Sequence, residues 1–173
     1  NLGNVLFDLG RYDEAVEHLR SALRLAPDRA AVHAELGSVR AEQRRLDQAI
    51  ASLSEAVRLD PHLGKAHFNL GTILAHQNRF DEAIPHYRQA IENDAEDADV
   101  HNNLGFALWR IGRSDESRVE FEQAIALDAE NANAHFNLAR LLVDEGRMAD
   151  ANRHLRIAAR LDPRYADLLR SSE

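Results

Sequence analysis

The chain has 173 residues, of which 45% are hydrophobic and 29% are charged, and its formal net charge is −8. A chain this apolar is expected to fold rather than to stay disordered. Its charges are mixed along the sequence instead of forming basic blocks, and phosphate binding needs clustered Lys and Arg, so we expect no nucleic acid among its partners.

The sequence contains no cysteine, which excludes a disulfide framework and thiol chemistry. No apolar run approaches the roughly 20 residues of a membrane span, and the start lacks the pattern of a signal peptide. We therefore expect no membrane insertion, and the cytoplasm is favoured as the compartment. Because the chain opens in the middle of a pattern at Asn1, we also expect it to be a fragment or a processed chain.

The sequence repeats itself at intervals of 34 residues. The tripeptide Asn-Leu-Gly at residues 69–71 returns at residues 103–105 and also occurs at residues 1–3. A fixed period in this range indicates an array of structural repeats. The expected repeats span residues 1–29, 30–63, 64–97, 98–131 and 132–165, the first without its opening five residues, and residues 166–173 would begin a further or capping helix.

From the first repeat to the last, each block is expected to form two helices around a short break, because apolar residues recur at i, i+3 and i+4 in both halves. The break contains a residue that tolerates a left-handed backbone conformation, with Arg44 as the exception. These residues are Gly10, Asn78, Gly112 and Gly146. An aspartate three residues later is expected to cap the second helix. These aspartates are Asp13, Asp47, Asp81 and Asp115. Proline then ends the second helix in three repeats, at Pro27, Pro61 and Pro163.

In each repeat a small residue on the first helix is followed by a large residue on the second helix, and both recur every 34 residues. Gly71 and Gly105 lie on the first helices, and Tyr87 and Phe121 lie 16 residues further on, in the second helices. Small residues let the two helices of a block approach closely, and the large residues fill the space beside them. Since one pair of helices cannot bury such a face alone, neighbouring pairs are expected to stack into a solenoid.

These recurring residues resemble the tetratricopeptide repeat (TPR) family, whose 34-residue helix-turn-helix unit has Leu-Gly, Ala, an aromatic residue or Leu, Ala and Pro at set places. The resemblance covers residues 1–165. It implies an all-α fold, a right-handed superhelical solenoid of helix-turn-helix repeats, and a single domain over residues 1–173. It also implies a concave groove lined by the first helix of each repeat.

The groove positions implied by the resemblance are rich in asparagine, which forms helices poorly. These residues are Asn69, Asn103, Asn137, Asn102 and Asn133. An amide offers both donors and an acceptor, which suits the backbone of an extended peptide. Similar asparagine ladders line the repeat region of O-linked N-acetylglucosamine transferase. The alternative is that these amides bond to the neighbouring helix and shape the scaffold.

The same positions carry aromatic and cationic side chains. They are Phe68, Phe106, Trp109, Phe136, Arg110 and Arg140. An aromatic anchor in a groove can dominate binding affinity. Packing between helices is the alternative role, and we favour groove exposure for Phe68 and Phe106 and packing for Trp109.

Histidines also recur with the period of the repeat, at His33, His67, His101 and His135. Metal ligands must lie about 2 Å from one ion, whereas packed helices are about 8–10 Å apart. We therefore expect these histidines to bind no metal. The resemblance to the TPR family implies that they pack at the repeat junctions, in a place where the family often has an aromatic residue. The second-helix residues His18, His86 and His154 are expected to face outward.

No HExxH, Gly-rich phosphate loop, GxSxG or Cys–His arrangement is present. We therefore expect no catalytic site and no cofactor. The leading hypothesis is a non-enzymatic protein–protein interaction scaffold that binds an extended peptide segment in its groove. The alternatives are a structural scaffold that stacks weakly end to end through its open ends, and the substrate-recognition region of a larger enzyme such as a glycosyltransferase.

Overall fold

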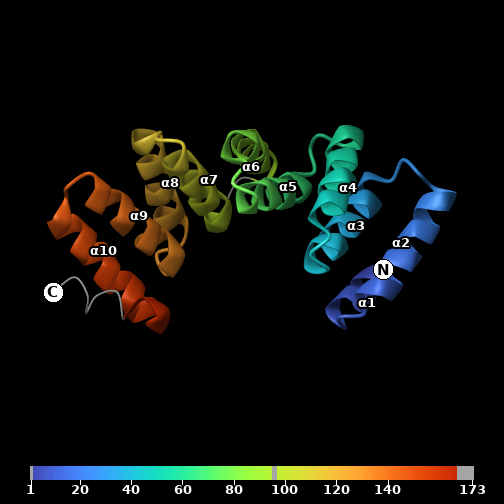
Figure 1. Ribbon diagram of the computed structural model, residues 1–173, viewed down its shortest axis with the longest axis horizontal. Helices are drawn as coiled ribbons and strands as arrows, with labels where there is room; N and C mark the ends of the chain where they lie inside the picture. Colours follow the sequence, from blue (N-terminus) through green and yellow to red (C-terminus); the bar gives the residue numbers. More distant parts are fainter. Residues whose placement is uncertain (1, 95–96, 167–173) are drawn as a thin grey trace. The chain divides into compact units, whose positions relative to one another are not determined.

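The computed structural model describes residues 2–94 and 97–166, and every regular element in these ranges is helical. Each expected repeat contains two α-helices (Figure 1). The last repeat adds a short 3-10 helix. The helices are α1 (Leu2–Asp8) and α2 (Tyr12–Leu25), α3 (Ala30–Glu42) and α4 (Leu46–Leu59), α5 (Gly64–His76) and α6 (Phe80–Asp94), α7 (Ala98–Arg110) and α8 (Ser114–Leu127), α9 (Ala132–Asp144) and α10 (Met148–Leu161), and η1 (Pro163–Tyr165). The expected helix over residues 166–173 lies, apart from Ala166, outside the described residues.

The chain forms two compact units, residues 1–94 with three helix pairs and residues 95–173 with two. Within each unit the two helices of a repeat pack together, and the second helix also packs on the first helix of the next repeat. First helices touch as well, α1 with α3, α3 with α5, and α7 with α9. The first helices of a unit therefore form a layer of their own, and the all-α repeat fold is as predicted. The single domain over residues 1–173 stays a prediction.

The two helices of every repeat are joined by the same turn. Its central residue has a positive φ in all five repeats, including 60° at Arg44 and 61° at Asn78. In the second repeat the N–H of Arg44 bonds to the carbonyl of Ala41, and that of Arg45 bonds to the carbonyl of Arg40. This pair of bonds is a Schellman motif. Arg44 therefore adopts the conformation that Gly or Asn adopts in the other repeats.

The expected aspartate caps are wrong. The second helices begin earlier than expected, so that Asp13, Asp47 and Asp115 lie in the first turn instead of at the cap, and Asp81 lies in the first turn of α6. The reason is the tightness of the turn: the arginine that completes the Schellman motif, such as Arg45, is already the N-cap of the next helix. The aspartates instead place negative charge near the positive end of the helix dipole.

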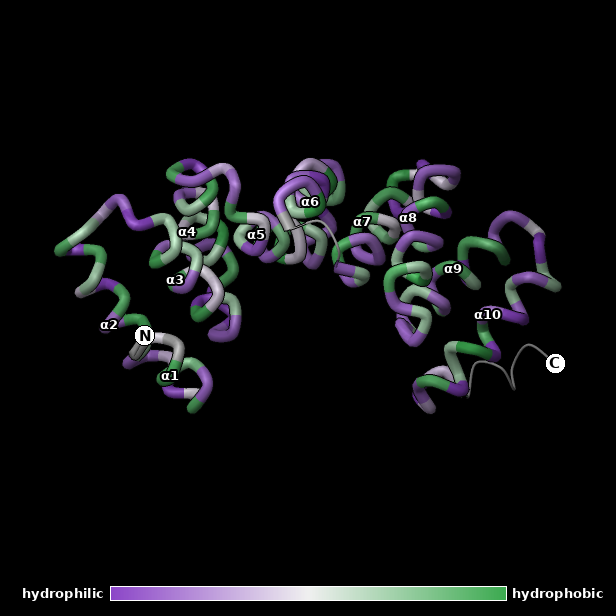
Figure 2. The backbone as a smooth tube through the Cα atoms, turned by 180° about the vertical axis from the view of Figure 1, so that it is seen from behind, coloured by the Kyte–Doolittle hydropathy of each residue, from purple (hydrophilic) through white to green (hydrophobic). Residues whose placement is uncertain are grey.

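The core within a repeat follows the small–large pattern of the sequence. A Cβ atom added to Gly105 would lie 2.8 Å from the ring of Phe121, and one added to Gly71 would lie 3.0 Å from the ring of Tyr87. Both rings are almost fully buried. Figure 2 shows hydrophobic segments alternating with hydrophilic ones along the helices, as expected for amphipathic helices that bury one face.

None of the helices in the described ranges has the length and apolar character needed to cross a membrane.

Candidate peptide-binding surface

In the first unit, Asn69 connects two first helices. Its Nδ2 on α5 donates to Ser38 Oγ on α3 at 3.0 Å, and Ser38 Oγ donates to the carbonyl of Ala34 at 3.1 Å. Beside it, the half-buried ring of Phe68 lies 6.2 Å from the ring of Tyr87, tilted by 51°. Asn69 thus contributes to the scaffold, and the bond uses one of the two donor hydrogens of its amide.

In the second unit, an asparagine network joins α7 and α9. Asn137 Nδ2 donates to Asn102 Oδ1 at 2.9 Å, and Asn102 Nδ2 lies 3.4 Å from Asn103 Oδ1. Asn102 is buried, whereas Asn103 and Asn137 are half-buried. Asn102 is therefore placed to orient its two neighbours, whose amides keep part of their exposure.

Aromatic and cationic side chains lie together on the same two helices. Trp109 and Phe106 of α7 make an edge-on contact with ring centroids 6.1 Å apart. The guanidinium of Arg140 on α9 lies 4.6 Å from the Trp109 ring and 5.6 Å from the Phe136 ring. Arg110 lies 5.7 Å from the Phe106 ring. The predicted groove aromatics of this unit thus form one cluster, in which both arginines are exposed and the three rings are half-buried.

Two further side chains complete the cluster. Asp144 of α9 accepts a hydrogen bond from Trp109 Nε1 at 2.9 Å. Tyr165 of η1 stacks on Phe136, with ring centroids 4.4 Å apart and planes at 18°, and its hydroxyl donates to Asn133 Oδ1 at 2.5 Å. Sequence reasoning gave Tyr165 no role, because no tyrosine occupies its register in the other repeats. The carbonyl oxygen of the exposed Asn133 is therefore already engaged.

Two of the four periodic first-helix histidines, His67 and His135, are each paired with a histidine on the second helix of the same repeat. His67 Nδ1 lies 3.0 Å from His86 Nδ1, and His135 Nδ1 lies 2.9 Å from His154 Nδ1. The expectation that His86 and His154 face outward is wrong, since both are half-buried against these partners. The two histidines of a pair are 19 residues apart in the sequence. The 34-residue period by which the histidines were recognised therefore did not predict their pairing.

In each pair, a backbone carbonyl determines which ring nitrogen of the first-helix histidine carries the proton. His67 Nε2 lies 3.2 Å from the carbonyl of Pro61, which can only accept, so this nitrogen carries the proton. Nδ1 of His67 then accepts from Nδ1–H of His86. His135 has the equivalent contact with the carbonyl of Ala129, at 3.3 Å. If both rings of a pair were protonated, two N–H donors would face each other and the hydrogen bond between the rings would be lost.

Burial lowers the pKa of all four histidines below its ordinary value. For His86 and His154, the neighbouring imidazole of the pair lowers the pKa further. In the fourth repeat the arrangement differs, because His101 Nδ1 faces a carboxylate, Glu120 Oε2, at 2.7 Å. Within the described part of the chain, no group of three or more His, Cys, Asp or Glu side chains is arranged to hold a metal ion.

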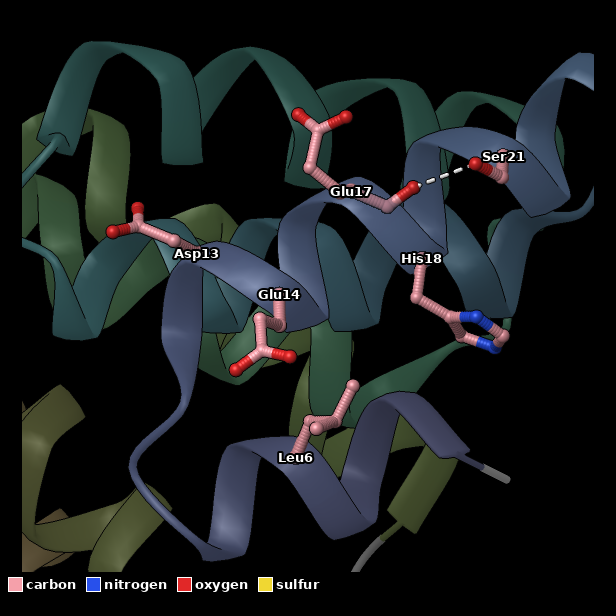
Figure 3. A pocket seen from close by; sticks show the side chains of 6 residues that line it. All are labelled: Leu6, Asp13, Glu14, Glu17, His18 and Ser21. Carbon is pink, nitrogen blue, oxygen red and sulfur yellow. Dashed lines mark hydrogen bonds between the residues drawn. The ribbon is translucent and has the colours of Figure 1, made fainter.

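An open pocket lies between α1 and α2 (Figure 3). It is lined by Leu6, Asp13, Glu14, Glu17, His18 and Ser21. His18 is exposed here and occupies the register that His86 and His154 hold in their repeats, where a first-helix histidine covers the ring. The residues that line this pocket include none of the asparagines and aromatic residues described above.

A pair of helices in every repeat, one turn geometry in all five repeats and glycine–ring contacts at a fixed register in the third and fourth repeats define the chain as a TPR array, a class of protein-interaction scaffold. Within this class, the model of the family described as the Cilia and flagella-associated protein 70 C-terminal domain matches residues 1–172. The chain belongs to that family.

Solved structures share the fold. YrrB, whose structure is described as that of a TPR protein with an unusual peptide-binding site, is 23% identical with a TM-score of 0.83, and the match covers 94% of this chain and 84% of YrrB. A structure of MamA is 21% identical with a TM-score of 0.86, covering 96% of this chain and 98% of that one. MamA from Desulfovibrio magneticus RS-1 is 19% identical with a TM-score of 0.86, covering 94% and 92%. No curated protein matches the sequence.

Proposed function

We propose that this protein is a non-enzymatic scaffold that holds an extended segment of a partner protein against the first helices of its repeats. The observation that carries the proposal is the surface on α7 and α9, where half-buried amides lie on the same helices as half-buried rings. Amides can bond to peptide N–H and C=O groups whatever the peptide sequence, and aromatic side chains provide anchors.

The hydrogen bonds of Asn69 and Asn137 within the scaffold are compatible with this role. Each bond uses one donor hydrogen, while an amide has two donors and an acceptor oxygen. The same bonds hold the amides in place before a peptide arrives, which reduces the entropy lost on binding. Asn102 and Asn133 fit a supporting role better, because the first is buried and the second accepts from Tyr165.

The experiment is selection from a library of random peptides, followed by titration of the selected peptides by fluorescence anisotropy. Replacing Asn69, Asn103 and Asn137 together by Ala is expected to weaken binding about tenfold or more, with little change in helicity. Asn152→Ala is the matched control, because it removes an equally half-buried asparagine from a second helix. The proposal fails if no peptide is selected, or if the triple variant binds as tightly as the unmodified protein.

Light scattering during the same titration tests the stacking alternative. Val5 and Leu9 of the first unit are 52% and 63% exposed, and stacking of copies through this part of the unit would cover them. We expect a constant mass at the concentrations of the titration. A mass that grows with concentration and is reduced by Leu9→Gln would instead favour self-assembly.

A further inference from the structure

We propose that Arg140 selects an acidic side chain of the bound segment, so that the preferred partner is an extended peptide with an Asp or Glu two positions from an aromatic or large aliphatic residue. The inference rests on the proposed function and specifies the chemistry of the peptide. It is carried by the contacts of Arg140 in the second unit.

Arg140 is exposed, yet its guanidinium is held in place. It lies 4.6 Å from the Trp109 ring of α7 and 5.6 Å from the Phe136 ring of α9. Stacking on aromatic faces leaves the edge of the guanidinium, with its N–H donors, available for a planar acceptor. Because the rings already restrict the side chain, little further entropy is lost when a ligand binds.

Two exposed carboxylates on α7 and α9 accept hydrogen bonds from donors other than Arg140. Asp144, one turn after Arg140 on α9, accepts from Trp109 Nε1 at 2.9 Å. Asp99 of α7 accepts from Asn131 Nδ2 at 3.0 Å. Among the described residues no carboxylate forms an ion pair with Arg140, whereas Arg113 and Arg147 each pair with an acidic residue three positions along the chain. Arg140 is thus a cation with a defined orientation, and no carboxylate in the described part of the chain forms an ion pair with it.

A side-chain carboxylate fits the chemistry of this site. One guanidinium binds one carboxylate through two parallel N–H···O bonds. A carboxylate within an extended segment also lets the backbone on both sides reach the amides of Asn103 and Asn137, while a chain terminus would use one side only.

The rings set the second feature of the partner. In an extended peptide, residues two positions apart point to the same side and lie about 6.5–7 Å apart. The Trp109 ring lies 4.6 Å from the Arg140 guanidinium, and the Phe106 ring lies 6.1 Å from the Trp109 ring. An apolar side chain two positions from the acid is therefore placed to pack against these rings.

The test uses the peptides selected from the random library, synthesised with acetylated and amidated ends and in matched forms with Glu or Gln. Glu-containing peptides are expected to bind about tenfold more tightly than their Gln forms. Arg140→Gln should remove this difference by weakening binding of the Glu peptide far more than binding of the Gln peptide, while Arg140→Lys should retain part of the difference. Asp144→Asn is expected to strengthen binding of the Glu peptide about twofold to fivefold, because it removes a nearby negative charge.

Arg160→Gln is the matched control, since Arg160 is an exposed arginine of the same unit on a second helix. Melting curves for each variant verify that it is folded. If selected peptides bind equally well with Glu or Gln, or if binding needs a free carboxyl terminus, the proposal is overturned while the proposed function stands. If no peptide binds, both are overturned.

Discussion

Arg44 is the residue whose backbone differs most from what its side chain prefers. It has a φ of 60° at a position where the other repeats have Gly or Asn. A residue with a Cβ loses about 1–2 kcal/mol in this conformation, while glycine loses about 0.5–1 kcal/mol through its greater freedom in the unfolded chain. We therefore expect Arg44→Gly to stabilise the protein by about 0.5–1 kcal/mol and to raise the melting temperature by a few degrees.

The reverse substitution supplies the control for Arg44→Gly. Gly112 occupies the same place in the fourth repeat with a φ of 82°, so Gly112→Arg should lower the melting temperature. A lower melting temperature for Arg44→Gly would show that the Arg44 side chain makes contacts that outweigh the backbone strain.

The sequence predicted the positions of the asparagines in the candidate site but not the residues that they contact. The asparagine positions follow from the period, but their partners do not, because Ser38 lies 31 residues before Asn69 and Asn102 lies 35 before Asn137. Side-chain geometry decides which neighbour is reached. Tyr165 has no recurring equivalent at all, so periodicity could not indicate that it covers Phe136.

At the scale of the element, close packing between the two helices of a repeat depends on the absence of one carbon atom. A Cβ at Gly105 would lie 2.8 Å from the Phe121 ring and 3.2 Å from the carbonyl oxygen of Ser117. Gly105→Ala should therefore destabilise the protein by about 1–2 kcal/mol: overpacking costs about 1–3 kcal/mol, and the better helix propensity of alanine offsets up to about 1 kcal/mol of it. Thermal or urea unfolding measures the change.

The fifth repeat provides the compensating variant for Gly105→Ala. In the same registers it has Ala139 and Leu155 in place of Gly105 and Phe121. The double variant Gly105→Ala with Phe121→Leu should therefore lose less free energy of unfolding than the two single variants lose when their losses are added. Simple additivity would mean that the ring does not limit the approach of the two helices.

Element boundaries show why a correct periodic pattern can still misplace a cap. The sequence predicted two helices per repeat and the residue in the turn between them. It misassigned Asp13 and Asp115, because the turn is short enough for the arginine that ends the Schellman motif to begin the next helix. An aspartate is favoured both at a cap and in the first turn, so residue type alone does not distinguish the two places.

At the scale of the molecule, the period predicted the number of helices and the small–large packing between them, because these features recur in every repeat. It did not predict the imidazole pairs, which depend on side chains 19 residues apart in the third and fifth repeats. Each unit contains one such pair. A change of charge at these pairs therefore acts on both halves of the chain.

Stability is expected to fall as the pH falls below about 6.5, the ordinary pKa of histidine. Burial, and for His86 and His154 also the neighbouring imidazole, lowers the pKa in the folded state. The unfolded chain then binds more protons than the folded one, so the stabilisation is present above the unfolded pKa and is lost as the pH falls toward the folded pKa. Melting temperatures between about pH 8 and pH 5.5 measure the effect, since carboxylates with ordinary pKa values stay ionised there.

The fourth repeat supplies the variant that identifies the source of this acid sensitivity. Glu120 occupies the register of His86 and His154 and faces His101 at 2.7 Å. The double variant His86→Glu with His154→Glu gives His67 and His135 a carboxylate partner, which favours the protonated imidazole. Its melting temperature should therefore fall less between pH 8 and pH 5.5 than that of the unmodified protein. An identical pH profile for both proteins would assign the acid sensitivity to groups other than the two pairs.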